Sequence, residues 1–124
     1  METNALWLWV AAGLSLFTFA LHSFATRHDI VQPLLEADLH RVSKYTHYYC
    51  WHMVTITLFA MAVFYAVAAQ FPSAWELAAV STGLAMAFAL WSIALVVWKR
   101  QKMFELPQWT LFIVISAAGA MGFI

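Results

Sequence analysis

The sequence predicts an all-α protein: a four-transmembrane-helix bundle with a short interfacial helix between spans 1 and 2. Three observations support this fold class. Hydrophobic residues make up 65% of the 124 residues and charged residues only 10%, whereas a soluble domain has about a quarter charged residues. The apolar residues form four long stretches. All six lysines and arginines fall in two polar stretches between them.

The predicted spans cover about residues 5–25, 45–71, 75–98 and 107–124 of a single membrane domain. Each stretch reaches roughly the 17 to 20 residues that a helix needs to cross the hydrocarbon core. Helices are expected because isolated strands leave backbone polar groups unpaired in lipid. The first stretch has no basic segment before it, so we expect a retained helix and not a cleaved signal peptide.

The connection between spans 1 and 2 has a helical pattern of its own. Leu35, Leu39 and Val42 recur at positions i, i+4 and i+7 among polar residues, and Pro33 suits a first helical turn. This pattern predicts a short helix that lies in the membrane interface. The alternative is an irregular loop.

The basic residues predict the direction of the spans. With four spans, the connections after spans 1 and 3 lie on one side of the membrane. Those two connections hold Arg27, Arg41, Lys44, Lys99, Arg100 and Lys102. The positive-inside rule therefore places both connections in the cytoplasm and both termini outside.

Small residues predict close packing of the last two spans. Ala79, Gly83 and Ala87 repeat every four residues in span 3, and Ala118 and Gly122 do so in span 4. Small side chains let helix backbones approach one another where lipid offers no hydrophobic drive. We therefore expect both sets to face neighbouring helices.

Two of the five histidines, His22 and His52, are expected at membrane depth on antiparallel neighbouring helices. Each belongs to a polar stripe at helical spacing. The stripes are Ser15, Thr18, His22 and Thr26 in span 1, and Tyr45, Tyr48, His52 and Thr55 in span 2. Ionisable residues inside a membrane are costly and therefore mark functional sites. We expect the two histidines to share one ligand or one hydrogen-bond network.

The histidine pair allows several uses, which stay open at the level of sequence. The two imidazoles suit the axial positions of a b-type haem, or a metal ion with His47 as a third ligand. With Tyr48 and Trp51 they suit the headgroup of a lipid or a quinone. The candidate ligand-binding residues are His22, His52, Tyr48, Trp51, Thr55 and Thr18. The structural alternative is an interhelical hydrogen bond.

Other patterns exclude several functions. The net charge of zero gives no reason to expect nucleic acid as a partner. All six carboxylates are terminal, in connections or at span ends, which argues against a proton-coupled antiporter with a membrane-embedded acid. The chain has no glycine-rich phosphate loop, nucleophile elbow or HExxH motif.

Residues 22–55 contain three short motifs, His22-Ser23, Pro33-Leu34-Leu35 and Trp51-His52 with Thr55, and Pro107-x-Trp109 opens the last span. In these motifs the chain resembles, over nearly its whole length, a group of small uncharacterised bacterial four-helix integral membrane proteins. Where the group has a Gly-Glu pair, this chain has Thr26-Arg27. The group has no established activity; the resemblance supports the same fold and draws attention to His22 and His52. We expect the protein in a bacterial inner membrane.

The leading hypothesis is a small non-catalytic integral membrane protein. Its partners are the lipid bilayer together with a membrane-protein partner or a second copy of itself. It binds a partner helix or a lipid- or quinone-like ligand at its histidine-bearing cytoplasmic half. The competing hypothesis is a redox protein or membrane enzyme that uses His22 and His52 around haem b, a metal or a quinone.

Overall fold

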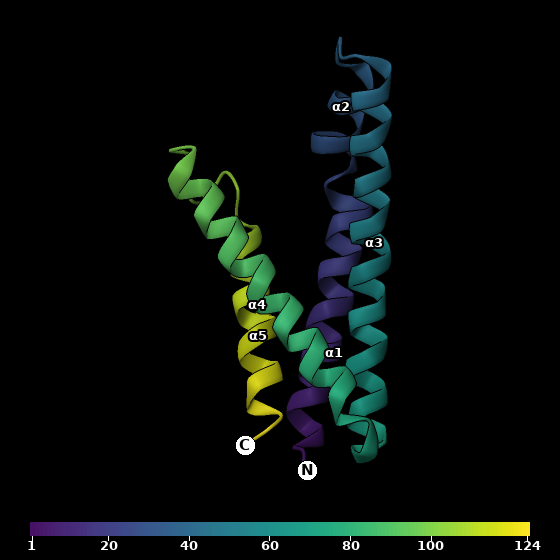
Figure 1. Ribbon diagram of the computed structural model, residues 1–124, viewed down its shortest axis with the longest axis vertical. Coiled ribbons are helices and arrows are strands. Elements are labelled where there is room, and N and C mark those ends of the chain that lie inside the picture. Colours follow the sequence, from purple (N-terminus) through teal and green to yellow (C-terminus); the bar gives the residue numbers. More distant parts are fainter.

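The computed structural model describes residues 1–124 and contains helices and no strands. The prediction of an all-α fold is therefore confirmed. Two π-helical segments follow the first helix, and a 3-10 turn precedes the fourth (Figure 1). The α-helices are α1 (Ala5–Ala20), α2 (Gln32–Glu36), α3 (Arg41–Gln70), α4 (Trp75–Trp98) and α5 (Gln108–Met121); the π-helical segments are Leu21–Ala25 and Arg27–Val31, and the 3-10 turn is Pro72–Ala74.

Helices occupy all four apolar stretches of the sequence. Three of them, Ala5–Ala25, Arg41–Gln70 and Pro72–Trp98, are long and apolar enough to cross a membrane. The fourth, α5, is apolar but has only 14 residues. The α3 helix, with 30 residues, is about 45 Å long and begins four residues before its predicted span.

Local chemistry sets where α3 and α4 end. Phe71 precedes Pro72 and is extended, with φ −125° and ψ 95°, because the proline ring disfavours helical geometry in the residue before it. Arg100 has φ 53° and reverses the chain after α4. The Gln101 amide then donates to the Val96 carbonyl at 2.9 Å, the closure typical of a left-handed helix end.

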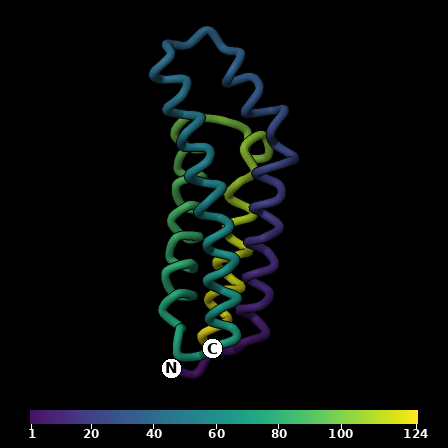
Figure 2. Tube along the Cα trace, turned by 90° about the vertical axis from the view of Figure 1, so that its right-hand side faces the viewer, coloured from purple at the N-terminus to yellow at the C-terminus, as the bar shows by residue number.

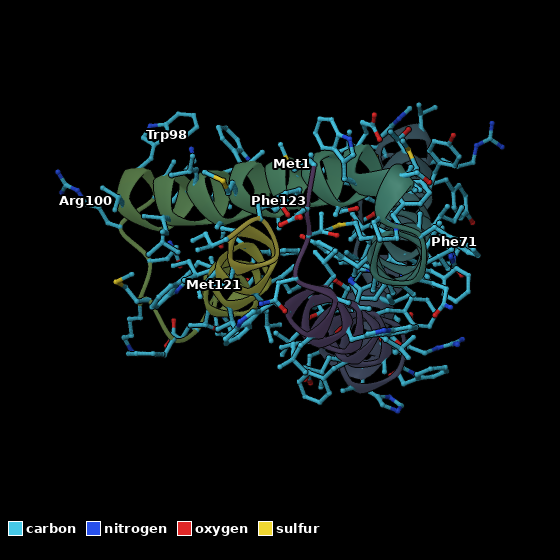
Figure 3. The ribbon with its side chains drawn as sticks, turned by 90° about the horizontal axis from the view of Figure 1, so that it is seen from below. Met1, Phe71, Trp98, Arg100, Met121 and Phe123 are labelled. Carbon is cyan, nitrogen blue, oxygen red and sulfur yellow. The ribbon has the colours of Figure 1, made fainter.

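The four longer helices pack around one core. The α1 helix packs against α3 and α5, and α4 packs against the same two helices. Both termini lie at one end of the molecule (Figure 1), where the Asn4 amide donates to the Gly122 carbonyl at 2.8 Å. The connection between α1 and α3 forms the opposite end (Figure 2). Towards its C-terminus α4 diverges from α3, so that Trp98 and Arg100 lie far from it (Figure 3).

The prediction for the small residues of α4 is wrong. Gly83 is exposed, and a Cβ atom built on it would meet nothing within 4 Å. The side chains of α4 that are buried are Ala78, Ser81, Thr82, Ala85, Ala89 and Val96. Alanine and other small residues occur on every face of α4, so a four-residue repeat of small residues does not identify the packed face.

The prediction for the small residues of α5 is confirmed. Ala118 is buried, and a Cβ atom on Gly122 would collide with the Leu8 side chain of α1. Gly119 lies in a second close contact, which the sequence did not predict. It packs against a buried hydrogen bond in which the Tyr65 and Thr82 hydroxyl oxygens are 2.9 Å apart. Glycines of α5 therefore let this helix approach α1 and α4 and the Tyr65 side chain of α3.

The expected interfacial helix is present only as α2, about one and a half turns long. It ends at Ala37, whose ψ of 144° is extended. Leu39 lies outside any helix and Val42 belongs to α3, so the predicted apolar stripe on one helix is wrong. The Lys44 ammonium donates to the Leu35 carbonyl at 3.0 Å and holds α2 against α3, a favourable position for a cation at a helix C-terminus.

Candidate functional site

A cavity of about 80 Å³ lies between the π-helical segments after α1 and the N-terminal half of α3. Its lining includes four of the six predicted ligand-binding residues. The lining residues are Ser23, Arg27, Val31, Tyr48, Trp51, His52 and Thr55. It therefore contains five residues with polar side-chain atoms besides the indole of Trp51.

The π-helical geometry brings the first chain segment to the cavity. The Thr26 amide donates to the Leu21 carbonyl at 3.1 Å, five residues back, and the Gln32 amide donates to the Arg27 carbonyl in the same way. Such segments insert a residue into a helix and occur frequently at functional sites. Ser23, Arg27 and Val31, four residues apart in sequence, line one wall of the cavity.

His22 joins α1 to α3 and does not line the cavity. Its Nε2 lies 3.1 Å from the Trp51 carbonyl, and because a carbonyl only accepts, Nε2 carries the proton that is donated. The imidazole also stacks on the Trp51 ring with 3.8 Å between the ring centroids. These two contacts position Trp51, a structural role for the half-buried His22 that the sequence left open.

His52 faces the cavity on α3. The imidazole ring of His52 and the ring of Tyr48 pack edge-to-face, with 4.7 Å between the ring centroids. Thr55, one turn further, donates its hydroxyl to the Trp51 carbonyl at 3.1 Å, so its oxygen faces the cavity as an acceptor. His22 and His52 thus lie on two segments that pack together, but His22 contacts Trp51 whereas His52 lines the cavity.

Ser23 and Arg27 are the cavity residues that the sequence analysis did not select. The Ser23 hydroxyl is buried and has no hydrogen-bond partner, which is unfavourable for a polar group. Arg27 has no carboxylate partner, because the one salt bridge of the chain joins Lys102 and Glu105. One sequence pattern could have pointed to these two residues: Ser23, Arg27 and Val31 recur at a four-residue spacing beside the histidine stripe.

Two predicted residues lie outside the cavity. Thr18 is buried and donates to the Leu14 carbonyl at 2.9 Å within its own helix. His47 is exposed, and its Nδ1 lies 2.7 Å from the Ser43 carbonyl one turn back. Neither residue contributes to the lining, so the metal set with His47 does not form.

The arrangement can be compared with the cofactors that the sequence suggested. No group of three or more His, Cys, Asp or Glu residues is close enough to hold a metal ion. The cavity, at about 80 Å³, has about half the roughly 150 Å³ that accommodates a benzene ring. A quinone ring or a haem macrocycle is larger still. The residues therefore fit a compact polar group better than any ring.

Comparison of the chain with protein-family models, curated proteins and solved structures gave no match. The functional argument therefore rests on the site itself.

Proposed function

We propose that the protein is a non-catalytic, four-span inner-membrane protein that binds the polar head of a lipid-like ligand between α1 and α3. The observation that carries this proposal is the cavity with its unpartnered Ser23 hydroxyl and unpaired Arg27. A buried hydroxyl without a partner gains from a polar ligand. Arg27 is exposed and has no ion-pair partner in the chain, so its guanidinium is free to bind an acceptor of such a ligand.

The packing of α5 supports four spans. With 14 residues, α5 is only about 21 Å long, shorter than the roughly 30 Å hydrocarbon core. It nevertheless packs between α1 and α4, and both of these helices are long enough to cross. Large apolar side chains are exposed around the helices, among them Ile56 at 69%, Leu90 at 66% and Val80 at 56%, which suits a lipid environment.

The positions of the termini support the orientation. Both termini lie at one end of the molecule, and the connection that holds Arg27 lies at the other (Figures 1 and 2). By the positive-inside rule the basic end faces the cytoplasm. Trp51 lies roughly 29 Å along α3 from Gln70, at about 1.5 Å per residue. This distance supports a position of the cavity near the cytoplasmic boundary of a hydrocarbon core about 30 Å thick.

The shape of the site favours a ligand headgroup over a partner helix. A helix docks through a long apolar groove, whereas this cavity is small and has four polar or charged residues among the seven that line it. No side chain in it is arranged as a nucleophile with a base, because His52 contacts the Tyr48 ring and the Ser23 hydroxyl has no partner. The proposal is therefore binding without covalent chemistry.

The test is the ligand content of the protein after purification in a mild detergent. Organic extracts of wild type and His52→Leu are compared by mass spectrometry for retained lipid and quinone. The variant loses one hydrogen-bonding group, so retained ligand is expected to fall about 2- to 10-fold. His47→Leu is the matched control, since His47 is on the same helix and outside the cavity. Equal ligand content in all three proteins contradicts the proposal, and a Soret band in the absorption spectrum favours the redox alternative.

A further inference from the structure

The cavity carries positive charge without a compensating carboxylate. Arg27 is the only charged residue in its lining. The six carboxylates belong to Glu2, Asp29, Glu36, Asp38, Glu76 and Glu105, and none of them lines the cavity. An arginine presents five N–H donors in a planar fork and binds phosphate with two parallel hydrogen bonds. The charge of the cavity therefore favours an anion.

Four polar side chains of the cavity, those of Ser23, Arg27, Tyr48 and His52, can donate a hydrogen bond to a ligand. The Ser23 hydroxyl is buried and free to donate, and the hydroxyl of Tyr48 and the ring of His52 each offer one further N–H or O–H. The Thr55 oxygen is the exception, because its proton is already donated to the Trp51 carbonyl, and it accepts from a ligand hydroxyl. A phosphate, which has several acceptor oxygens, complements this set.

The size and the depth of the cavity also favour a phosphate. The volume of about 80 Å³ is too small for an aromatic ring by the benzene comparison, whereas a tetrahedral phosphate is more compact. Ser23 lies roughly 27 Å along its helix from Ala5, at about 1.5 Å per residue. The cavity is therefore near the depth at which phospholipid phosphates lie.

We infer that the ligand is the phosphate of an anionic phospholipid, with Arg27 as its main contact and the Ser23, Tyr48 and His52 donors around it. This inference rests on the proposed function and names the chemical class of its ligand. A phospholipid of the cytoplasmic leaflet carries this chemistry within reach of the cavity, and free phosphate carries it in solution.

The experiment measures binding to the full-length protein in detergent by native mass spectrometry. The probes are dioctanoyl phosphatidylglycerol, dioctanoyl phosphatidylcholine, inorganic phosphate and a short-chain ubiquinone. Arg27→Gln is expected to weaken phosphatidylglycerol binding about 10- to 100-fold, the range for a hydrogen bond to a charged group. Arg41→Gln, at the first residue of α3 and outside the cavity, removes the same charge and is expected to weaken phosphatidylglycerol binding by about 5-fold at most.

Each outcome separates the inference from the proposed function. Selective, Arg27-dependent binding of phosphatidylglycerol supports the inference, and competition by inorganic phosphate supports phosphate recognition with free phosphate as a second source. Equal binding of phosphatidylcholine, or equal losses in the two arginine variants, overturns it. Binding of ubiquinone alone, lost in His52→Leu, overturns the inference and leaves the proposed function standing. If no probe binds, both fail.

Discussion

Gly119→Ala is expected to destabilise the packing of α5 against α3 and α4. A Cβ atom at this position would collide with the Thr82 hydroxyl oxygen and lie 2.6 Å from the Tyr65 hydroxyl oxygen. Both side chains are buried, and their hydroxyls are hydrogen-bonded to each other. The Thr82 hydroxyl also donates to the Ala78 carbonyl at 2.8 Å, so it is held from two sides. The added methyl group can be accommodated only if these side chains move.

The magnitude follows from two opposing terms. Inserting a methyl group into a well-packed core costs typically 1 to 3 kcal/mol. Against this, alanine is a better helix former than glycine by about 0.5 to 1 kcal/mol. The free energy of unfolding is therefore expected to fall by about 0 to 2.5 kcal/mol, with a middle value of roughly 1 kcal/mol. If the Tyr65–Thr82 hydrogen bond breaks as well, the loss grows by about 1 kcal/mol.

The assay is reversible unfolding in mixed detergent micelles, followed by circular dichroism. Gly83→Ala is the matched control, since Gly83 also lies within a helix but a Cβ atom there meets nothing within 4 Å. This control is expected to leave stability unchanged or to raise it by up to about 1 kcal/mol. If Gly119→Ala is as stable as Gly83→Ala, the argued contact of α5 with the Tyr65–Thr82 pair is refuted.

Three further predictions concern topology, the histidine contact and the buried tyrosine. A reporter active only in the cytoplasm should work when inserted at Lys102 and be silent when fused after Ile124; the reverse result overturns the orientation. His22→Phe keeps the stacking on Trp51 but loses the hydrogen bond to its carbonyl, so stability should fall by about 1 kcal/mol while retained ligand is unchanged. Tyr65→Phe should lower the free energy of unfolding by about 1 kcal/mol, and no change in micelle unfolding would mean that its hydroxyl contributes nothing.

The helices were predictable because the physics that sets them is local. Apolar stretches of sufficient length become helices wherever the backbone must bond to itself, and Pro72 ends α3 through its effect on Phe71. The connection after α1 was less predictable. Its apolar periodicity indicated one helix with Leu35, Leu39 and Val42, but Leu35 lies in α2, Leu39 in no helix and Val42 in α3. Contacts with α3, such as the Lys44 bond to Leu35, help to decide its path.

The candidate site was half visible in the sequence. Tyr48, His52 and Thr55 belong to a polar stripe that periodicity reveals, and they line the cavity. Ser23 and Arg27 were not selected, because their four-residue spacing with Val31 points to a cavity only once the π-helical geometry and the facing helix are known. His22 was selected for its expected depth, but its partner is the backbone carbonyl of Trp51, which no side-chain pattern specifies.

The sequence by itself determined that the chain is helical, where its apolar stretches lie, and that its basic residues gather in two connections. Only the tertiary structure decided which face of each helix is packed. In a soluble protein the buried face is the apolar one, but these helices carry apolar side chains on exposed faces too, among them Met86 and Leu90 of α4. Gly83 and Ala85 of α4 are both small residues within an apolar stretch, so the sequence does not distinguish the faces on which they lie. In the structure Gly83 is exposed and Ala85 is buried.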